Sequence, residues 1–164
     1  MINVFEKDSL IKYRNTNLNE SVLRERLVTD SVSKTKIFIS HKHDDLDKVI
    51  DIISMLEKEY NCFCYIDSRD STMPPHTNRI TAEKLRQNIE NCNKFILLAT
   101  PSAIKSCWCN WELGIGDVLK ARSNNLALLF VKDGFETRSF DDNEYMRLYP
   151  YIVRRDKGDK FVNG

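Results

Sequence analysis

Apolar residues along this chain form short runs that alternate with segments in which they recur every three or four positions. The runs occupy residues 35–40, 62–67, 94–99 and 126–131 and are rich in Ile, Phe, Leu and Val, which is typical of β-strands. Between the runs, the three- and four-residue spacing places the apolar residues on one face of a helix. The pattern therefore predicts strands alternating with helices.

Two of these runs, KFILLA and LALLFV, are apolar at almost every position. A strand that is apolar on both faces must be covered on both faces, as the strands of a parallel sheet are. A further run at residues 149–153, YPYIV, predicts a fifth strand, and residues 154–164 are expected to form a polar tail. Between the third and fourth strands, one helical region is expected from residue 100 to about residue 122. We therefore expect an α/β fold of flavodoxin-like type, in which a central parallel sheet of about five strands carries helices on both faces.

The first 34 residues differ from the rest because they are polar, with only scattered apolar positions. Within residues 20–29, Val22, Leu23 and Leu27 can share one face of a short helix. We expect residues 1–34 to form an arm that leans on a single domain spanning residues 35–164. At the first helix of that domain, Asp44 is the expected N-cap.

The composition limits which binding partners and which cellular compartment are expected for this protein. The 25 Lys and Arg residues balance 24 Asp and Glu residues, so no net field attracts nucleic acid or an anionic membrane surface. No run approaches the ~18 apolar residues that a membrane helix needs. The five cysteines lie in apolar stretches, and no secretory leader precedes them, so we expect buried free thiols in a cytoplasmic protein.

Ligands of such folds bind at the carboxyl ends of the strands. The histidines and cysteines offer no metal-binding spacing, because Cys62-x-Cys64 and Cys107-x-Cys109 are too close together and no HExxH motif occurs. No metal site is predicted. Residues 114 and 116 are glycines within a helical segment, where we expect them to allow close approach to the sheet.

The most unusual segment is SCWCNWELGIGD, at residues 106–117. Trp108 and Glu112 are four residues apart, so they lie on one helix face with Trp111 beside them. An aromatic plane next to a carboxylate suits a ribose that carries a flat leaving group. Spacing alone favours the other interpretation, in which the tryptophans pack in the core and Glu112 is solvated.

Three segments taken together, KIFISHKHDD, YIDSRDSTMP and KFILLATPSAIKSCWCNWELGIGD, resemble the successive motifs of a TIR (Toll/interleukin-1 receptor) domain. The resemblance extends over residues 35–153 and is strongest to bacterial TIR-like defence proteins of the Thoeris type. Many bacterial TIR domains cleave the nicotinamide–ribose bond of NAD and release ADP-ribose or cyclise it. The resemblance thus implies NAD as the substrate and no separate cofactor.

The resemblance also assigns residues. It implies that Glu112 is the catalytic glutamate and that Trp108 is its aromatic partner. It places the remaining substrate-binding residues in the loops after the first two strands and beside Trp108: Ser40, His41, Lys42, Asp67, Ser68, Asp70 and Trp111. A carboxylate beside the ribose can stabilise the oxocarbenium-like cation that forms when nicotinamide leaves.

The expected function is that of an NAD glycohydrolase or ADP-ribosyl cyclase in bacterial anti-phage signalling. The family further implies self-association through TIR surfaces and an effector that is reached through a nucleotide signal. Two alternatives remain open at this point. One is a non-catalytic TIR interaction module, and the other is a nucleoside-processing enzyme of similar fold.

Overall fold

A computed structural model of the chain describes residues 5–25, 34–67, 79–132, 144–153 and 160–162. Its centre is one sheet with the strand order β3-β2-β4-β5-β6-β7, and β1 pairs with β5 outside this path. The strands are β1 (Phe5–Glu6), β2 (Lys36–Ser40), β3 (Phe63–Ile66), β4 (Lys94–Ala99), β5 (Leu126–Lys132), β6 (Tyr151–Val153) and β7 (Lys160–Val162). All pairings are parallel except that of β6 with β7.

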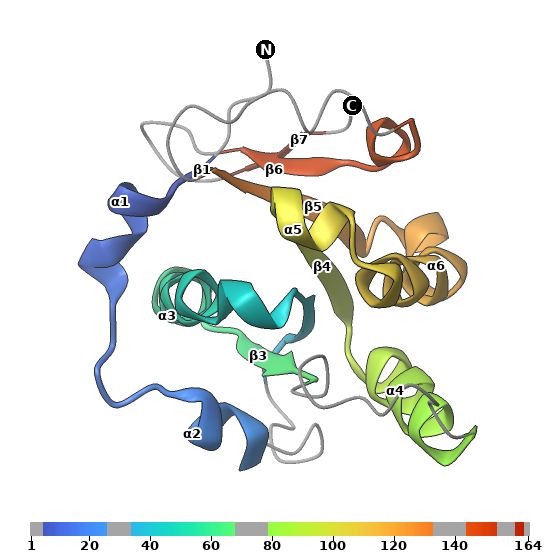
Figure 1. The fold of residues 1–164 in the computed structure, drawn as a ribbon, viewed down its shortest axis with the longest axis horizontal. Helices are drawn as coiled ribbons and strands as arrows, with labels where there is room; N and C mark the ends of the chain where they lie inside the picture. The colour runs from blue at the N-terminus through green and yellow to red at the C-terminus, as the bar shows by residue number, and fades with distance from the viewer. Residues whose placement is uncertain (1–4, 26–33, 68–78, 133–143, 154–159, 163–164) are drawn as a thin grey trace.

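Helices cover both faces of this sheet (Figure 1). The α-helices are α1 (Lys7–Leu10), α2 (Glu20–Glu25), α3 (Leu46–Tyr60), α4 (Arg79–Asn91), α5 (Pro101–Ile104) and α6 (Cys107–Lys120). Short 3-10 turns are η1 (Ile11–Tyr13), η2 (His43–Asp45), η4 (Ala121–Ser123) and η5 (Met146–Leu148). None of the helices in these described segments is long and apolar enough to cross a membrane.

The two faces bury separate sets of strand residues, because side chains alternate along each strand. Ile37 and Ile39 of β2 face α3, where they meet a core that also contains Ile52. Phe38, between them, faces the side of α4 and α6 and stacks on Phe95 with ring centroids 5.6 Å apart. The flavodoxin-like α/β fold with helices on both faces is thus confirmed.

The N-terminal arm contributes more than the sequence indicated. Phe5 pairs in register with Val131 of β5, so the arm adds a short strand to the sheet. Leu10, Leu18 and Leu23 are buried in the core on the α3 face. The helix expected within residues 20–29 is present as α2, and residues 26–29 lie outside the described part. The division of the chain into an arm, residues 1–34, and one domain, residues 35–164, stays a prediction.

Three local predictions were wrong. The first helix of the domain is not capped by Asp44, because η2 precedes α3 and no side chain caps α3. The helix expected from residue 100 to about residue 122 is interrupted near Lys105, so α5 and α6 are separate helices. The polar tail contains β7, which pairs with β6 through its backbone.

The glycine and cysteine predictions are each confirmed in part. A Cβ on Gly116 would lie 2.9 Å from Cγ of Phe95, so the close approach of α6 to the sheet requires glycine there. Gly114 is exposed, and apart from its chain neighbours and the backbone of its own helix no atom of the described residues lies within 4 Å of that position, so the same prediction for it was wrong. All five cysteines are free, and four are buried, whereas Cys107 is exposed.

Candidate active site

The first component of the site is Ser40, the last residue of β2. This strand lies between β3 and β4, and Ser40 pairs with Leu97 of β4. Because side chains alternate along the strand, Ser40 follows Phe38 onto the face covered by α4 and α6. Its side chain is buried at the carboxyl edge of the parallel strands, which is where ligands of such folds bind.

The second component is the start of α6. The Ser106 side chain caps this helix by accepting a hydrogen bond from the backbone N–H of Cys109 at 3.2 Å. The cap fixes the first residue of the helix, which puts Trp108 in the first turn and Glu112 one turn later. Trp108 Nε1 donates a hydrogen bond to Glu112 Oε1 at 3.0 Å.

Glu112 joins the two components, because Ser40 Oγ donates a hydrogen bond to Glu112 Oε2. The Glu112 side chain is buried, with only 2% of the residue exposed, although other residues of α6, such as Gly114, are exposed. A buried carboxylate is strongly destabilising unless hydrogen-bond donors surround it. The interpretation in which Glu112 is solvated is therefore wrong, and the structure brings Ser40, Trp108 and Glu112 together.

A second buried carboxylate, Asp45, is the last residue of η2, and the sequence did not indicate its role. It accepts hydrogen bonds from Thr100 Oγ1, from Ser102 Oγ at 2.7 Å and from Lys48 Nζ at 2.8 Å. The Thr100 side chain also caps α5 by accepting from Ala103 N. Asp45 thus connects η2, which follows β2, to the start of α5, which follows β4. The sequence feature that could have indicated this contact is Thr-Pro-Ser, which directly follows the buried strand β4.

The other predicted site residues lie around this edge. His41 is buried and Lys42 is half-buried in the segment between β2 and η2. Asp67 follows β3, whose last residue Ile66 pairs with Ile39 next to Ser40, so Asp67 reaches the same edge. Ser68 and Asp70 lie outside the described residues.

Trp111 is near Glu112 in sequence but takes part in a different contact. Its ring centroid lies 4.7 Å from that of Trp108, and the Arg86 guanidinium of α4 lies 5.5 Å from the Trp111 ring. Trp111 therefore packs against Trp108 and lines a surface groove between α4 and α6. In the described segments, no three His, Cys, Asp or Glu side chains form a group that could hold a metal ion.

Comparison with known proteins supports the TIR resemblance that the sequence motifs indicated. A curated relative from Bacillus cereus (strain MSX-D12), named probable 3' cyclic ADP-D-ribose synthase ThsB', is 27% identical over 120 residues. The match covers 72% of this chain but only 60% of the length of that relative. A model of the TIR domain matches residues 37–159, which include Ser40, Trp108 and Glu112. The chain belongs to the TIR domain family.

Proposed function

We propose that this protein is an NAD-consuming TIR enzyme that cleaves the nicotinamide–ribose bond and forms ADP-ribose or a cyclic ADP-ribose signal. The observation that carries the proposal is Glu112, a carboxylate buried at the carboxyl edge of the sheet and bonded to Ser40 and Trp108. The name of the Bacillus cereus relative, a probable cyclic ADP-ribose synthase, supports the same chemistry.

Bond cleavage in this proposal depends on stabilising positive charge. The electron pair of the C–N bond moves to the pyridinium nitrogen, so nicotinamide leaves as a neutral molecule and the ribosyl group becomes oxocarbenium-like. Because the leaving group needs no proton, a general acid is not required. Glu112 accepts hydrogen bonds from the ribose hydroxyls and stabilises the cation through its negative charge. Water then gives ADP-ribose, and a nucleophile within the same molecule gives a cyclic product.

The neighbours of Glu112 prepare it for this role. Ser40 and Trp108 are neutral donors that fix the orientation of the carboxylate, and each oxygen has lone pairs to accept further hydrogen bonds. A ribose hydroxyl can therefore join or replace the Ser40 hydroxyl at this carboxylate. The Trp108 ring, backed by Trp111, supplies an aromatic plane for nicotinamide or adenine. The remaining substrate contacts are proposed for the surrounding strand-end residues His41, Lys42, Asp67, Ser68 and Asp70.

We further propose that the enzyme acts in the cytoplasm, self-associates and signals to an effector through its nucleotide product in anti-phage defence. The groove between α4 and α6 supports self-association. It has a volume of about 540 Å³ and exposes apolar side chains, including Val118, which is 79% exposed. The same groove is the observation that favours the alternative function, a TIR interaction module that assembles without catalysis.

The test is nicotinamide release from NAD by concentrated protein, with products identified by mass spectrometry. Glu112→Gln keeps hydrogen-bonding atoms but removes the negative charge, so we expect turnover to fall by about 100-fold or more. Glu59→Gln, an exposed change on α3, serves as the control and should retain full turnover. No nicotinamide release by wild-type protein at any concentration would favour the interaction module. Equal turnover by Glu112→Gln would show that the negative charge needed for cleavage lies on another residue.

A further inference from the structure

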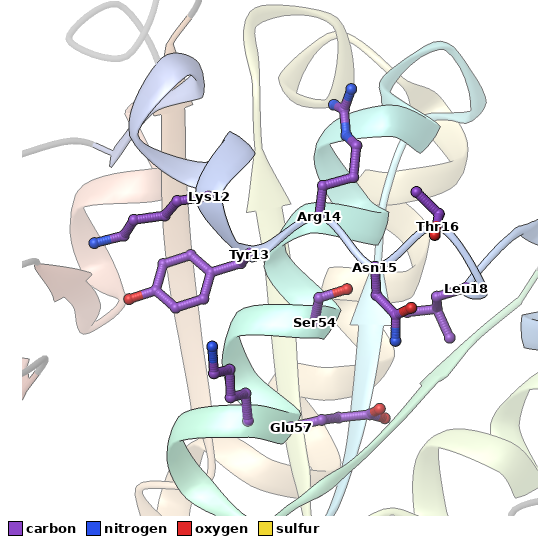
Figure 2. A pocket seen from close by; sticks show the side chains of 9 residues that line it. Lys12, Tyr13, Arg14, Asn15, Thr16, Leu18, Ser54 and Glu57 are labelled. Atoms are coloured by element: carbon purple, nitrogen blue, oxygen red, sulfur yellow. The ribbon is translucent and has the colours of Figure 1, made fainter.

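A second cavity lies on the opposite face of the sheet from Glu112, between the N-terminal arm and α3 (Figure 2). Its volume of about 450 Å³ falls within the range of about 300–1,000 Å³ that is typical of small-molecule sites. The arm provides one wall through Lys12 to Thr16, and α3 provides the other through Ser54, Glu57 and Lys58. The TIR resemblance assigns no role to these residues.

The walls of this cavity are held in place by two of its lining residues, Arg14 and Leu18, which also contact other parts of the protein. Arg14 donates two hydrogen bonds to Asp51 of α3, from Nε at 3.0 Å and from Nη2 at 2.8 Å. Asp51 is 1% exposed, so this ion pair is a fixed link between the arm and the helix. Leu18, at the end of the same arm segment, is buried in the core. The cavity is therefore formed before any ligand arrives.

Two ammonium groups converge on one ring at this cavity. Lys12 Nζ lies 4.9 Å and Lys58 Nζ lies 5.8 Å from the centroid of the Tyr13 ring. Within the described part of the chain, neither lysine forms an ion pair with a carboxylate. The Glu57 carboxylate accepts a hydrogen bond from Cys64 N at 2.9 Å, and Figure 2 shows it directed away from Lys12. The Lys12 end of the cavity is thus positively charged.

The other end of the cavity offers neutral polar groups. The Asn15 side-chain oxygen accepts a hydrogen bond from Asn17 N, which leaves its amide nitrogen as a donor. Thr16 adds a hydroxyl group. Two lysines favour a phosphate, while an amide and a hydroxyl suit the hydroxyls of a sugar. We propose that this cavity binds a phosphate-bearing ligand of about the size of a nucleoside monophosphate, with the phosphate at Lys12 and Lys58.

The test uses the full chain, labelled with ¹⁵N and titrated with AMP, ribose 5-phosphate, inorganic phosphate and adenosine. We expect saturable shifts at Tyr13 and Lys12 with AMP and ribose 5-phosphate, and none with adenosine, which lacks a phosphate. Lys12→Ala and Lys58→Gln should each weaken AMP binding by about tenfold or more. Lys84→Ala, which removes an exposed lysine on α4, should leave it unchanged.

Several outcomes would overturn the proposal. Absence of saturable binding by every phosphate compound, or binding that both lysine variants retain, rules out the site. Inorganic phosphate that binds as tightly as AMP contradicts a ligand of nucleotide size. Binding should persist unchanged in Glu112→Gln, because the two sites lie on opposite faces of the sheet. The result is thus independent of whether the protein cleaves NAD.

Discussion

Besides Asp45 at the carboxyl edge of the strands, two carboxylates are buried on opposite faces of the sheet, Asp51 on the α3 face and Glu112 on the α6 face. Their hydrogen-bond partners differ. Asp51 receives both hydrogen bonds from one guanidinium, that of Arg14. Glu112 accepts hydrogen bonds from a hydroxyl and an indole N–H that belong to different elements, β2 and α6. Both side chains are almost fully buried, so burial alone does not distinguish them.

The two carboxylates differ in whether a ligand can replace their hydrogen-bond partners. An arginine–carboxylate pair has two parallel charge-assisted bonds and is geometrically specific, so it suits a permanent link between the arm and α3. Neutral donors bind a carboxylate less strongly, and a substrate hydroxyl can take their place. We therefore assign Asp51 to stability and propose Glu112 for chemistry.

The largest expected effect on stability follows from breaking the Asp51 link. Asp51→Ala removes two charge-assisted hydrogen bonds, and we expect the free energy of unfolding to fall by about 2 kcal/mol. Urea unfolding followed by circular dichroism measures this change. Nicotinamide release, measured well below the unfolding midpoint, should stay at the wild-type level. Glu112→Gln should show the reverse, with lost turnover and a stability change of about 1 kcal/mol or less.

Asp47→Ala provides the control on the same helix. Asp47 is exposed in the first turn of α3, so its removal should change the free energy of unfolding by about 0.5 kcal/mol or less. If Asp51→Ala abolished nicotinamide release while the protein remained folded, the α3 face would also take part in the reaction. The assignment of the two carboxylates to separate roles would then be wrong.

Much of the α6 face could be predicted from the sequence. Apolar strand patterns gave the parallel sheet, and a spacing of four residues placed Trp108 and Glu112 on one helix face. Spacing could not show that Glu112 is buried, because its partner Ser40 lies 72 residues earlier in the chain. The motif resemblance supplied the candidate role of Glu112, and the structure supplied its contacts.

The α3 face was harder to predict. Phe5 and Leu10 belong to a polar segment whose few apolar residues show no long period, yet both are fully buried. Phe5 pairs with Val131 of β5, more than 120 residues later in the sequence, and Leu10 belongs to α1, which packs on α3. Likewise, Arg14 and Asp51 look like ordinary surface charges until the arm packs on α3. Long-range contacts of this kind leave no local pattern.

A smaller effect on stability is expected from the packing of α6 against the sheet. Gly116→Ala places a methyl group 2.9 Å from Cγ of Phe95, whose ring is buried and stacked on Phe38. Overpacking of this kind is destabilising by about 1–3 kcal/mol, and the gain in helix propensity offsets up to about 1 kcal/mol. We expect a net loss of about 1 kcal/mol in urea unfolding. An unchanged midpoint would mean that α6 can shift away from Phe95.

The smallest expected effect comes from the other glycine of the same helix. Gly114→Ala adds a methyl group that, among the described residues, meets no atom within 4 Å beyond its own helix backbone and chain neighbours, so only the helix propensity changes. The free energy of unfolding should therefore rise by about 0.5–1 kcal/mol, measured in the same urea series. The opposite signs at two positions of one helix would locate the tight contact at Gly116. A loss of stability at Gly114 would instead show that α6 also packs closely on its outer side, where the groove with α4 lies.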